Sequence, residues 1–202
     1  MTITTSAPAL VLRSPDASWN RARWEQLPDD GNRYEVIDGV LYMTTAPSYF
    51  HQWIIRQISL ALIEQLDRRG FGLTSWAPIG LFMPGCDPVQ PDIVMIQTSD
   101  LGIIHDRRIF GVPTLLVEIL SPTNPETDLQ IKRGAYARAG VPEYWIVRPA
   151  TRDVLVCSRP DTSLGDYVQT QLIDPDGTLA SPTLPFQATI ADFFAGAPDT
   201  TL

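Results

Sequence analysis

Two carboxylates that stand in apolar surroundings are the residues of this chain best suited to do chemistry. Glu118 is the one charged residue of the run TLLVEIL, residues 114–120, and Asp92 lies between Pro91 and the apolar residues 93–96. Burying an unpaired carboxylate costs on the order of several kcal/mol, so each needs a compensating group. A divalent cation would serve both, because magnesium binds one or two protein carboxylates and leaves its other positions to water and phosphate. The pattern therefore suits phosphodiester hydrolysis.

An alternative interpretation of the two acids needs no metal. In it Glu118 pairs with an arginine and Asp92 caps a turn, and the residue types alone do not decide between the two. Lys132 favours the metal site, because it is the one lysine beside 14 arginines and a guanidinium does not readily replace an ammonium in catalysis. Its own alternative role is a surface i, i+4 pair with Asp128 on the helix expected after the Glu118 strand.

Several motifs occur in an order that is typical of one family. They are RYEVIDG at residues 33–39, Pro47-Ser48 followed by His51, Pro91-Asp92-Ile93, VEILSP at residues 117–122, Lys132, and GVPEYW at residues 140–145. In these motifs, over roughly residues 19–149, the chain resembles the Uma family, a branch of the PD-(D/E)XK superfamily of restriction endonuclease-like nucleases. The resemblance rests on several motifs together, which makes it more specific than any one of them.

The resemblance implies a fold class and a set of catalytic residues. The fold is α/β, a restriction-endonuclease-like core with a central mixed β-sheet flanked by helices and with additional β-hairpins. The implied catalytic residues are Glu35, Asp92, Glu118 and Lys132. The superfamily usually has a lysine two residues after the glutamate, where this chain has Leu120. Related members use a basic residue on the next helix instead, which here is Lys132.

The resemblance also implies a cofactor and a reaction. A magnesium or manganese ion would be held by Asp92 and Glu118, with Glu35 directly or through water and with the backbone carbonyl of Ile119 as a further ligand. Such an ion polarises a phosphate and lowers the pKa of a bound water, while Lys132 orients that water or offsets charge on the phosphate. We therefore expect an endonuclease that hydrolyses DNA and, since superfamily members commonly cut both strands with two active sites, acts as a homodimer.

Two other functions stay open at this point. A nuclease-fold protein without catalysis, acting as a nucleic-acid or protein binding module, is favoured by the net charge of −8 and by Leu120. Hydrolysis of RNA or of a nucleotide would use the same metal chemistry and cannot be separated from DNA cleavage by sequence. The motifs GxSxG and HExxH and a glycine-rich phosphate loop do not occur, which argues against serine hydrolases, zinc proteases of that type and P-loop enzymes.

Weaker candidates surround this set. His51 lies where the family often has a histidine. It either supports a residue of the site or transfers a proton, or, as we prefer, it is a structural histidine whose hydrogen bonds are satisfied, and we leave it outside the catalytic set. Tyr136, one turn after Lys132, either lines a cleft or belongs to the core. The pairs Arg68-Arg69 and Arg107-Arg108 either contact a DNA backbone or are solvated loop charges.

The elements that must position these residues follow from local signals. Asp38-Gly39 predicts a hairpin between strands 34–37 and 40–43, the first of which carries Glu35. Ser48 predicts the start of a long helix that ends at Gly70. Further helices are expected over 19–27, after Ser18, and over 125–139. Strands are expected over 71–77, 79–83, 92–97, 115–120 and 143–147, with a crossover between the last two, and in a hairpin of 154–158 with 167–173.

Composition sets the outer limits. A chain of 202 residues, 44% of them hydrophobic, is long enough for one sizeable core and too short for two. We expect a flexible N-terminal leader over residues 1–17, a single domain over 18–195 and a tail over 196–202. The chain has no apolar stretch of membrane-spanning length and no secretory signal pattern. Cys86 and Cys157, with no CxxC spacing, fit a reducing cytoplasm.

Overall fold

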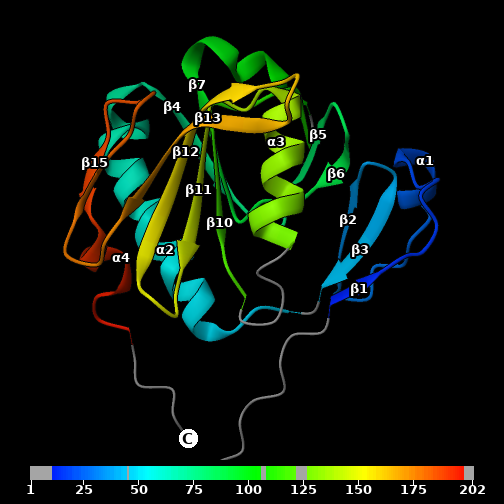
Figure 1. Cartoon of the computed structure of the whole chain (residues 1–202), viewed down its shortest axis with the longest axis horizontal. Helices are drawn as coiled ribbons and strands as arrows, with labels where there is room; N and C mark the ends of the chain where they lie inside the picture. The colour runs from blue at the N-terminus through cyan, green and yellow to red at the C-terminus, as the bar shows by residue number, and fades with distance from the viewer. Residues whose placement is uncertain (1–10, 45, 106–107, 122–126, 198–202) are drawn as a thin grey trace, which may run out of the picture.

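Two β-sheets with helices packed against them form the framework of the protein (Figure 1). The structure is a computed structural model and describes residues 11–44, 46–105, 108–121 and 127–197. Within that part of the chain, no helix is long and apolar enough to cross a membrane. The predicted mixed α/β architecture is confirmed.

The central sheet is mixed, as predicted, and has the strand order β13-β12-β11-β10-β7-β4. Strands β10 and β11 run parallel, and every other neighbouring pair in this sheet is antiparallel. The parallel pair is joined through α3 (Arg133–Ala139), which confirms the predicted crossover. The strands are β4 (Gly72–Trp76), β7 (Ile93–Gln97), β10 (Leu115–Ile119), β11 (Glu143–Arg148), β12 (Asp153–Asp161) and β13 (Asp166–Ile173).

The two faces of the central sheet are covered by different helices. The long helix α2 (Tyr49–Gln65) and the short α4 (Ile190–Phe194) pack on one face, against Val117 and Ile119 of β10. Leu116 of the same strand belongs instead to the core that includes α3. Because successive strand residues alternate between faces, Glu118 points to the α3 side. The other residues of β10 are all apolar because the strand is buried on both faces.

A second sheet lies on the α3 side, in the order β1-β3-β2-β6-β5-β9-β8. Its β2–β3 hairpin turns at Asp38 and Gly39, which have φ of 48° and 77°, as the sequence predicted. A Cβ at Gly39 would lie 2.4 Å from the Ala17 carbonyl oxygen, so only glycine fits. The strands are β1 (Val11–Arg13), β2 (Arg33–Ile37), β3 (Val40–Thr44), β5 (Gly80–Met83), β6 (Cys86–Val89), β8 (Ile104–His105) and β9 (Arg108–Phe110).

Three local expectations need correction. Strand β1 pairs with β3, so residues 11–13 of the expected leader belong to a sheet. Helix α1 (Arg21–Trp24) is shorter than predicted, and its cap is Asn20, whose side chain accepts a hydrogen bond from the Arg23 backbone N–H at 3.1 Å, and not Ser18. Strand β6 was missed because Pro88 interrupts its β-type pattern.

The helices nearest the site begin and end almost as predicted. Ser48 caps α2 by accepting from the backbone N–H of His51 at 3.2 Å. After α2 a 3₁₀ turn, η1 (Asp67–Arg69), ends at Gly70, whose φ is 77°. The helix predicted over 125–139 is a π-helical turn, η3 (Thr127–Lys132), followed directly by α3; residues 125 and 126 lie outside the described part.

The remaining elements close the fold. They are η2 (Thr98–Ile103) and the small hairpin of β14 (Thr178–Ala180) and β15 (Gln187–Thr189). Both cysteines are free and buried. Burial raises the pKa of Cys157 to about 11, so this thiol stays protonated and unreactive at neutral pH.

Candidate active site

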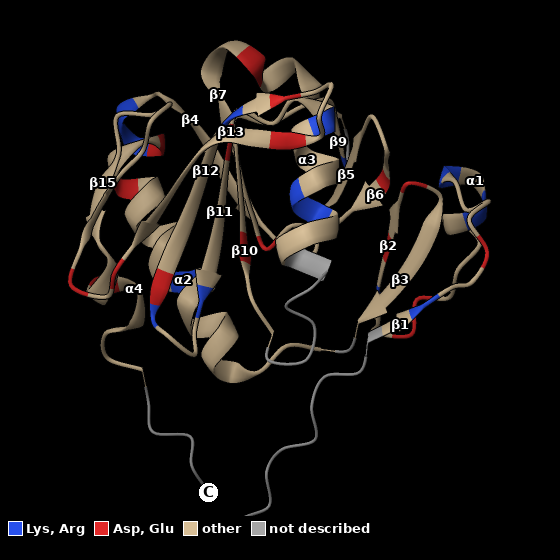
Figure 2. Ribbon diagram, in the orientation of Figure 1, with Lys and Arg blue, Asp and Glu red and all other residues tan. Residues whose placement is uncertain are grey.

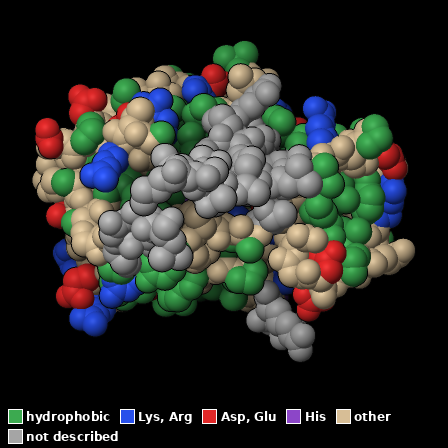
Figure 3. Space-filling model, turned by 90° about the horizontal axis from the view of Figure 1, so that it is seen from below, with side chains coloured by type: hydrophobic (Ala, Val, Ile, Leu, Met, Phe, Trp, Pro, Cys, Tyr) green, Lys and Arg blue, Asp and Glu red, His purple; other side chains and the backbone are tan. Residues whose placement is uncertain are grey.

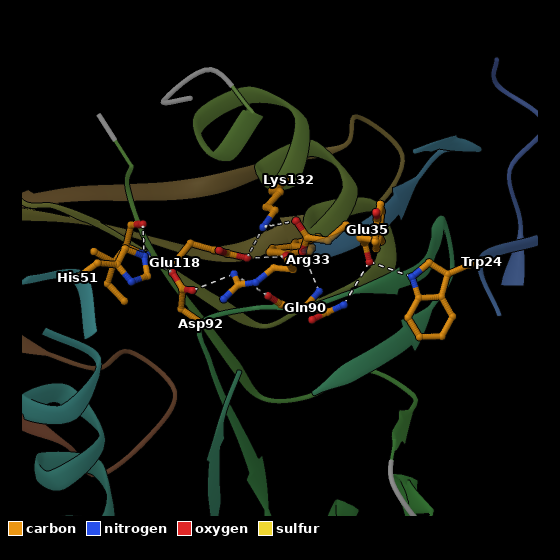
Figure 4. A network of polar contacts seen from close by, with 11 residues as sticks. Trp24, Arg33, Glu35, His51, Gln90, Asp92, Glu118 and Lys132 are labelled. Carbon is orange, nitrogen blue, oxygen red and sulfur yellow. Dashed lines mark hydrogen bonds and ion pairs between the residues drawn. The ribbon is translucent and has the colours of Figure 1, made fainter. Parts of the chain in front are cut away.

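The four residues predicted to be catalytic come together between the two sheets (Figure 4). Glu35 lies on β2, Asp92 directly before β7, Glu118 on β10 and Lys132 at the last position of η3. The whole-residue exposure of each is between 1% and 3%. Ile93 pairs with Val117 in the antiparallel β7–β10 ladder, so the next residues along, Asp92 and Glu118, are neighbours at its end.

Lys132 bridges two of the acids. Its Nζ lies 2.9 Å from Oε1 of Glu118 and 3.1 Å from Oε2 of Glu35. The interpretation of Lys132 as a surface residue paired with Asp128 is therefore wrong. A π-turn inserts one extra residue per turn and re-aims the side chains that follow, and such turns are frequent at functional sites. Here the π-turn ends at the residue that enters the site.

Two further donors fix the carboxylates that contact Lys132. The hydroxyl of Tyr136, from α3, donates to Oε1 of Glu118 at 2.8 Å, and the backbone N–H of Gln90 donates to Oε1 of Glu35 at 2.7 Å. Burial raises the pKa of Tyr136, and the nearby Glu118 and Glu35 raise it further, so the hydroxyl remains a donor. Tyr136 thus belongs to the core and reaches the site as well.

Asp92 has its own set of partners. Its Oδ2 accepts from the backbone N–H of Ile119 at 2.8 Å, and its Oδ1 accepts from Nη1 of Arg33 at 3.0 Å. Nε2 of His51 lies 3.1 Å from Oδ2. The expected alternative, in which Asp92 caps a turn, is wrong, because the carboxylate binds the backbone of a neighbouring strand.

The charge state of Asp92 follows from these contacts. Burial on its own raises the pKa of this carboxyl, but His51, Arg33 and the Ile119 N–H together outweigh it and hold the pKa below the usual range. Burial likewise lowers the pKa of Arg33, yet the neighbouring carboxylates, Asp92 first, raise it above its ordinary value. Asp92 is therefore an ionised acceptor at neutral pH.

Sequence reasoning missed the part played by Arg33 and set His51 aside. Nε2 of His51 lies 3.0 Å from the carbonyl oxygen of Ile119, while Nδ1 is buried with no hydrogen-bond partner among the described residues. One ring nitrogen of His51 thus has the contacts expected of a structural histidine, and the other has none among the described residues. Arg33 stands two residues before Glu35 on β2, and this spacing places both on one face of the strand, a signal that could have been used.

Only some of the donors that were expected to hold a hard cation lie together. Among the residues that the structure describes, no three His, Cys, Asp or Glu side chains converge to hold an ion by themselves. The expected set of Glu35, Asp92 and Glu118 is divided, because Lys132 holds the two glutamates while Arg33 holds Asp92. The Asp92 carboxylate and the Ile119 backbone carbonyl both lie within 3.1 Å of Nε2 of His51, and oxygen donors of this kind suit magnesium or manganese.

Two of the arginines suggested as DNA backbone contacts are paired with acids. Arg68 lies 2.6 Å from Glu64, and Arg108 lies 2.7 Å from Glu25; Arg107 is outside the described residues. Figure 2 shows acidic positions inside the fold, on β2 and β10, besides those at the periphery. Among the described residues that are visible from below, charged side chains of both signs occur, and those in view form no continuous basic patch (Figure 3).

Comparison with known proteins places the chain in a family. A model of the Uma2 family, described as "Putative restriction endonuclease", matches residues 21–192. A crystal structure from Anabaena variabilis, described as "a putative nuclease belonging to DUF820", is 19% identical and superposes with a TM-score of 0.73 over 87% of this chain and 97% of that one. No curated protein matches. The likeness to the crystal structure shows a shared nuclease-like fold, and the family match over most of the sequence shows that the chain belongs to the Uma2 family.

Proposed function

We propose that the protein is a metal-dependent endonuclease that hydrolyses phosphodiester bonds in DNA. The observation that supports this most is the burial of the one lysine between Glu118 and Glu35, together with a third buried acid, Asp92, that is held ionised. A buried ion pair contributes little net stability, because desolvation offsets the attraction between the charges. Perturbed ionisable groups packed together are instead typical of active sites.

The residues divide the work of hydrolysis among them. A bound magnesium or manganese ion supplies Lewis acidity, which polarises the phosphate and lowers the pKa of water. Asp92, Glu118 and the Ile119 carbonyl would hold that ion. Lys132 offsets charge that builds on the phosphate, and Glu35 keeps the ammonium in place. Tyr136 fixes the orientation of Glu118, so that the carboxylate does not rotate away.

Removal and return of the ion tests the proposal. We expect nicked and linear products from supercoiled plasmid in about 5–10 mM Mg²⁺ or Mn²⁺ and none in excess EDTA. Single-stranded RNA of the same sequence serves as the substrate control. Cleavage that persists in EDTA, or plasmid left intact in both ions, would contradict the proposal. Cleavage of RNA alone would show that the substrate is RNA and not DNA.

A second candidate function is binding without catalysis. Each site carboxylate already contacts a cation without an ion, because Lys132 contacts the two glutamates and Arg33 contacts Asp92. On this proposal plasmid is retained by the protein and never cut. Gel-shift measurements in EDTA and in Mn²⁺, run beside the cleavage assay, separate the two functions.

We also propose a homodimer that works in the cytoplasm. A double-strand cut needs two hydrolytic events, which two copies of the site would supply together, and the two buried free thiols suit a reducing compartment. We expect light scattering to give twice the mass of one chain. A mass of one chain in the presence of both DNA and Mn²⁺ would contradict the dimer.

A further inference from the structure

His51 is a side chain of the site whose contacts the proposed mechanism does not use. It lies in the first turn of α2, where Ser48 accepts its backbone N–H and so fixes the start of the helix. From there the ring crosses to the end of β10 (Figure 4). The His51 side chain is 12% exposed, so it lies at the edge of the site.

One ring nitrogen of His51 lies within hydrogen-bond distance of two oxygens at once. Nε2 of His51 is 3.1 Å from Oδ2 of Asp92 and 3.0 Å from the carbonyl oxygen of Ile119, and both oxygens are acceptors. A single N–H cannot point directly at both, and a hydrogen bond weakens as it bends. In octahedral coordination at about 2.1–2.2 Å, adjacent ligand atoms lie about 3.0–3.1 Å apart, which matches both separations.

The other contacts leave this corner available to a cation. Arg33 takes Oδ1 of Asp92, so Oδ2 is the oxygen that faces His51 and Ile119. Nδ1 of His51 has no partner among the described residues whether or not an ion binds. The choice between a shared hydrogen bond and an ion ligand therefore depends on Nε2. Nε2 is better used as an electron-pair donor to an ion that also binds the two oxygens.

We propose that His51 is a ligand of the site ion, through Nε2, and that it gives the site a preference for manganese-type ions over magnesium. This inference rests on the proposed metal dependence. Magnesium takes oxygen ligands and keeps its waters, whereas imidazole nitrogen suits transition ions, which bind N/O sites more tightly. An N, O, O donor set from His51, Asp92 and Ile119 therefore binds Mn²⁺ or Co²⁺ more tightly than Mg²⁺.

The chain offers a matched control, because it contains only two histidines. His105 is exposed on β8, away from the site, so a His105→Ala protein keeps His51 as its only imidazole. We expect this protein to bind Mn²⁺ at least about 10-fold more tightly than Mg²⁺ by calorimetry. We also expect pulsed EPR of its Mn²⁺ complex to detect coupling to one imidazole nitrogen.

Substitution of His51 supplies the second arm. His51→Ala should lower Mn²⁺ affinity by about 10–100-fold, change Mg²⁺ affinity by less than about 3-fold and abolish the nitrogen coupling. Absence of the coupling in His105→Ala, absence of Mn²⁺ binding, or unchanged Mn²⁺ affinity in folded His51→Ala each overturns the inference. The EPR arm needs no His51 variant, so poor folding of that variant does not block the test. The calorimetry and EPR samples contain no nucleic acid, so their results do not depend on cleavage. A protein that shows the nitrogen coupling but does not cut plasmid would contradict the proposed DNA cleavage and leave the assignment of His51 as a ligand standing.

Discussion

Asp92→Asn lowers plasmid cleavage on the order of 10³-fold while the fold survives. Asn preserves the shape of the side chain and can still accept from the Ile119 N–H, but it lacks the negative charge that would hold an ion. The variant also leaves Arg33 without its partner at 3.0 Å, so we expect a loss of about 2 kcal/mol in the free energy of unfolding at pH 7. Plasmid cleavage and urea denaturation measure the two effects.

The pH dependence of this stability loss has a definite sign. Because the pKa of Asp92 is lowered in the folded protein, its ionisation stabilises the fold above pH about 4, and this contribution is lost as the pH falls through the folded pKa. The difference between wild type and Asp92→Asn should therefore shrink from pH 7 toward pH 2. Asp100→Asn, at an exposed position of η2, is the matched control and should change neither cleavage nor stability. Wild-type cleavage by Asp92→Asn would remove Asp92 from the active site.

Lys132→Met should destabilise the protein by about 3–5 kcal/mol and abolish cleavage. The substitution leaves Glu118 and Glu35 buried with no cation at 2.9 and 3.1 Å, and breaking a buried pair from one side has this cost. Two buried carboxylates without a cation bind protons more readily in the folded state than in the unfolded one. The variant is therefore least stable at high pH, and its deficit relative to wild type should decrease as the pH falls toward 4.

The neighbouring residue provides the comparison. Arg133 is also a cation paired with an acid, at 2.7 Å from Asp166, but both side chains are partly exposed. Arg133→Met should cost less than about 1 kcal/mol and leave cleavage unchanged. Adding Glu118→Gln to Lys132→Met should recover part of the lost stability and none of the cleavage. If the free energy of unfolding of Lys132→Met is no lower than that of Arg133→Met, the contacts of Lys132 with Glu118 and Glu35 do not stabilise the fold by the expected amount.

Much of the framework could be predicted because its signals are local. Asp38-Gly39 adopts the positive φ of a tight turn, Ser48 accepts a backbone N–H three residues on, and Gly70 and Gly140 end helices with positive φ. The acids could be predicted too, since a charge inside an apolar run stands out and buried charge needs a partner. The one lysine was visible in composition alone.

The pairings inside the site were decided by the tertiary structure. Arg33 and Asp92 are 59 residues apart, and His51 and Ile119 are 68 apart, so no local pattern records that they meet. The π-turn that delivers Lys132 to Glu118 has no sequence signature distinct from an α-helix, and β6 is hidden by Pro88. Periodicity and residue type are enough to predict which groups are buried and need a partner. Only the folded chain decided which cation compensates which acid, because that choice depends on distances that sheet order and helix packing set.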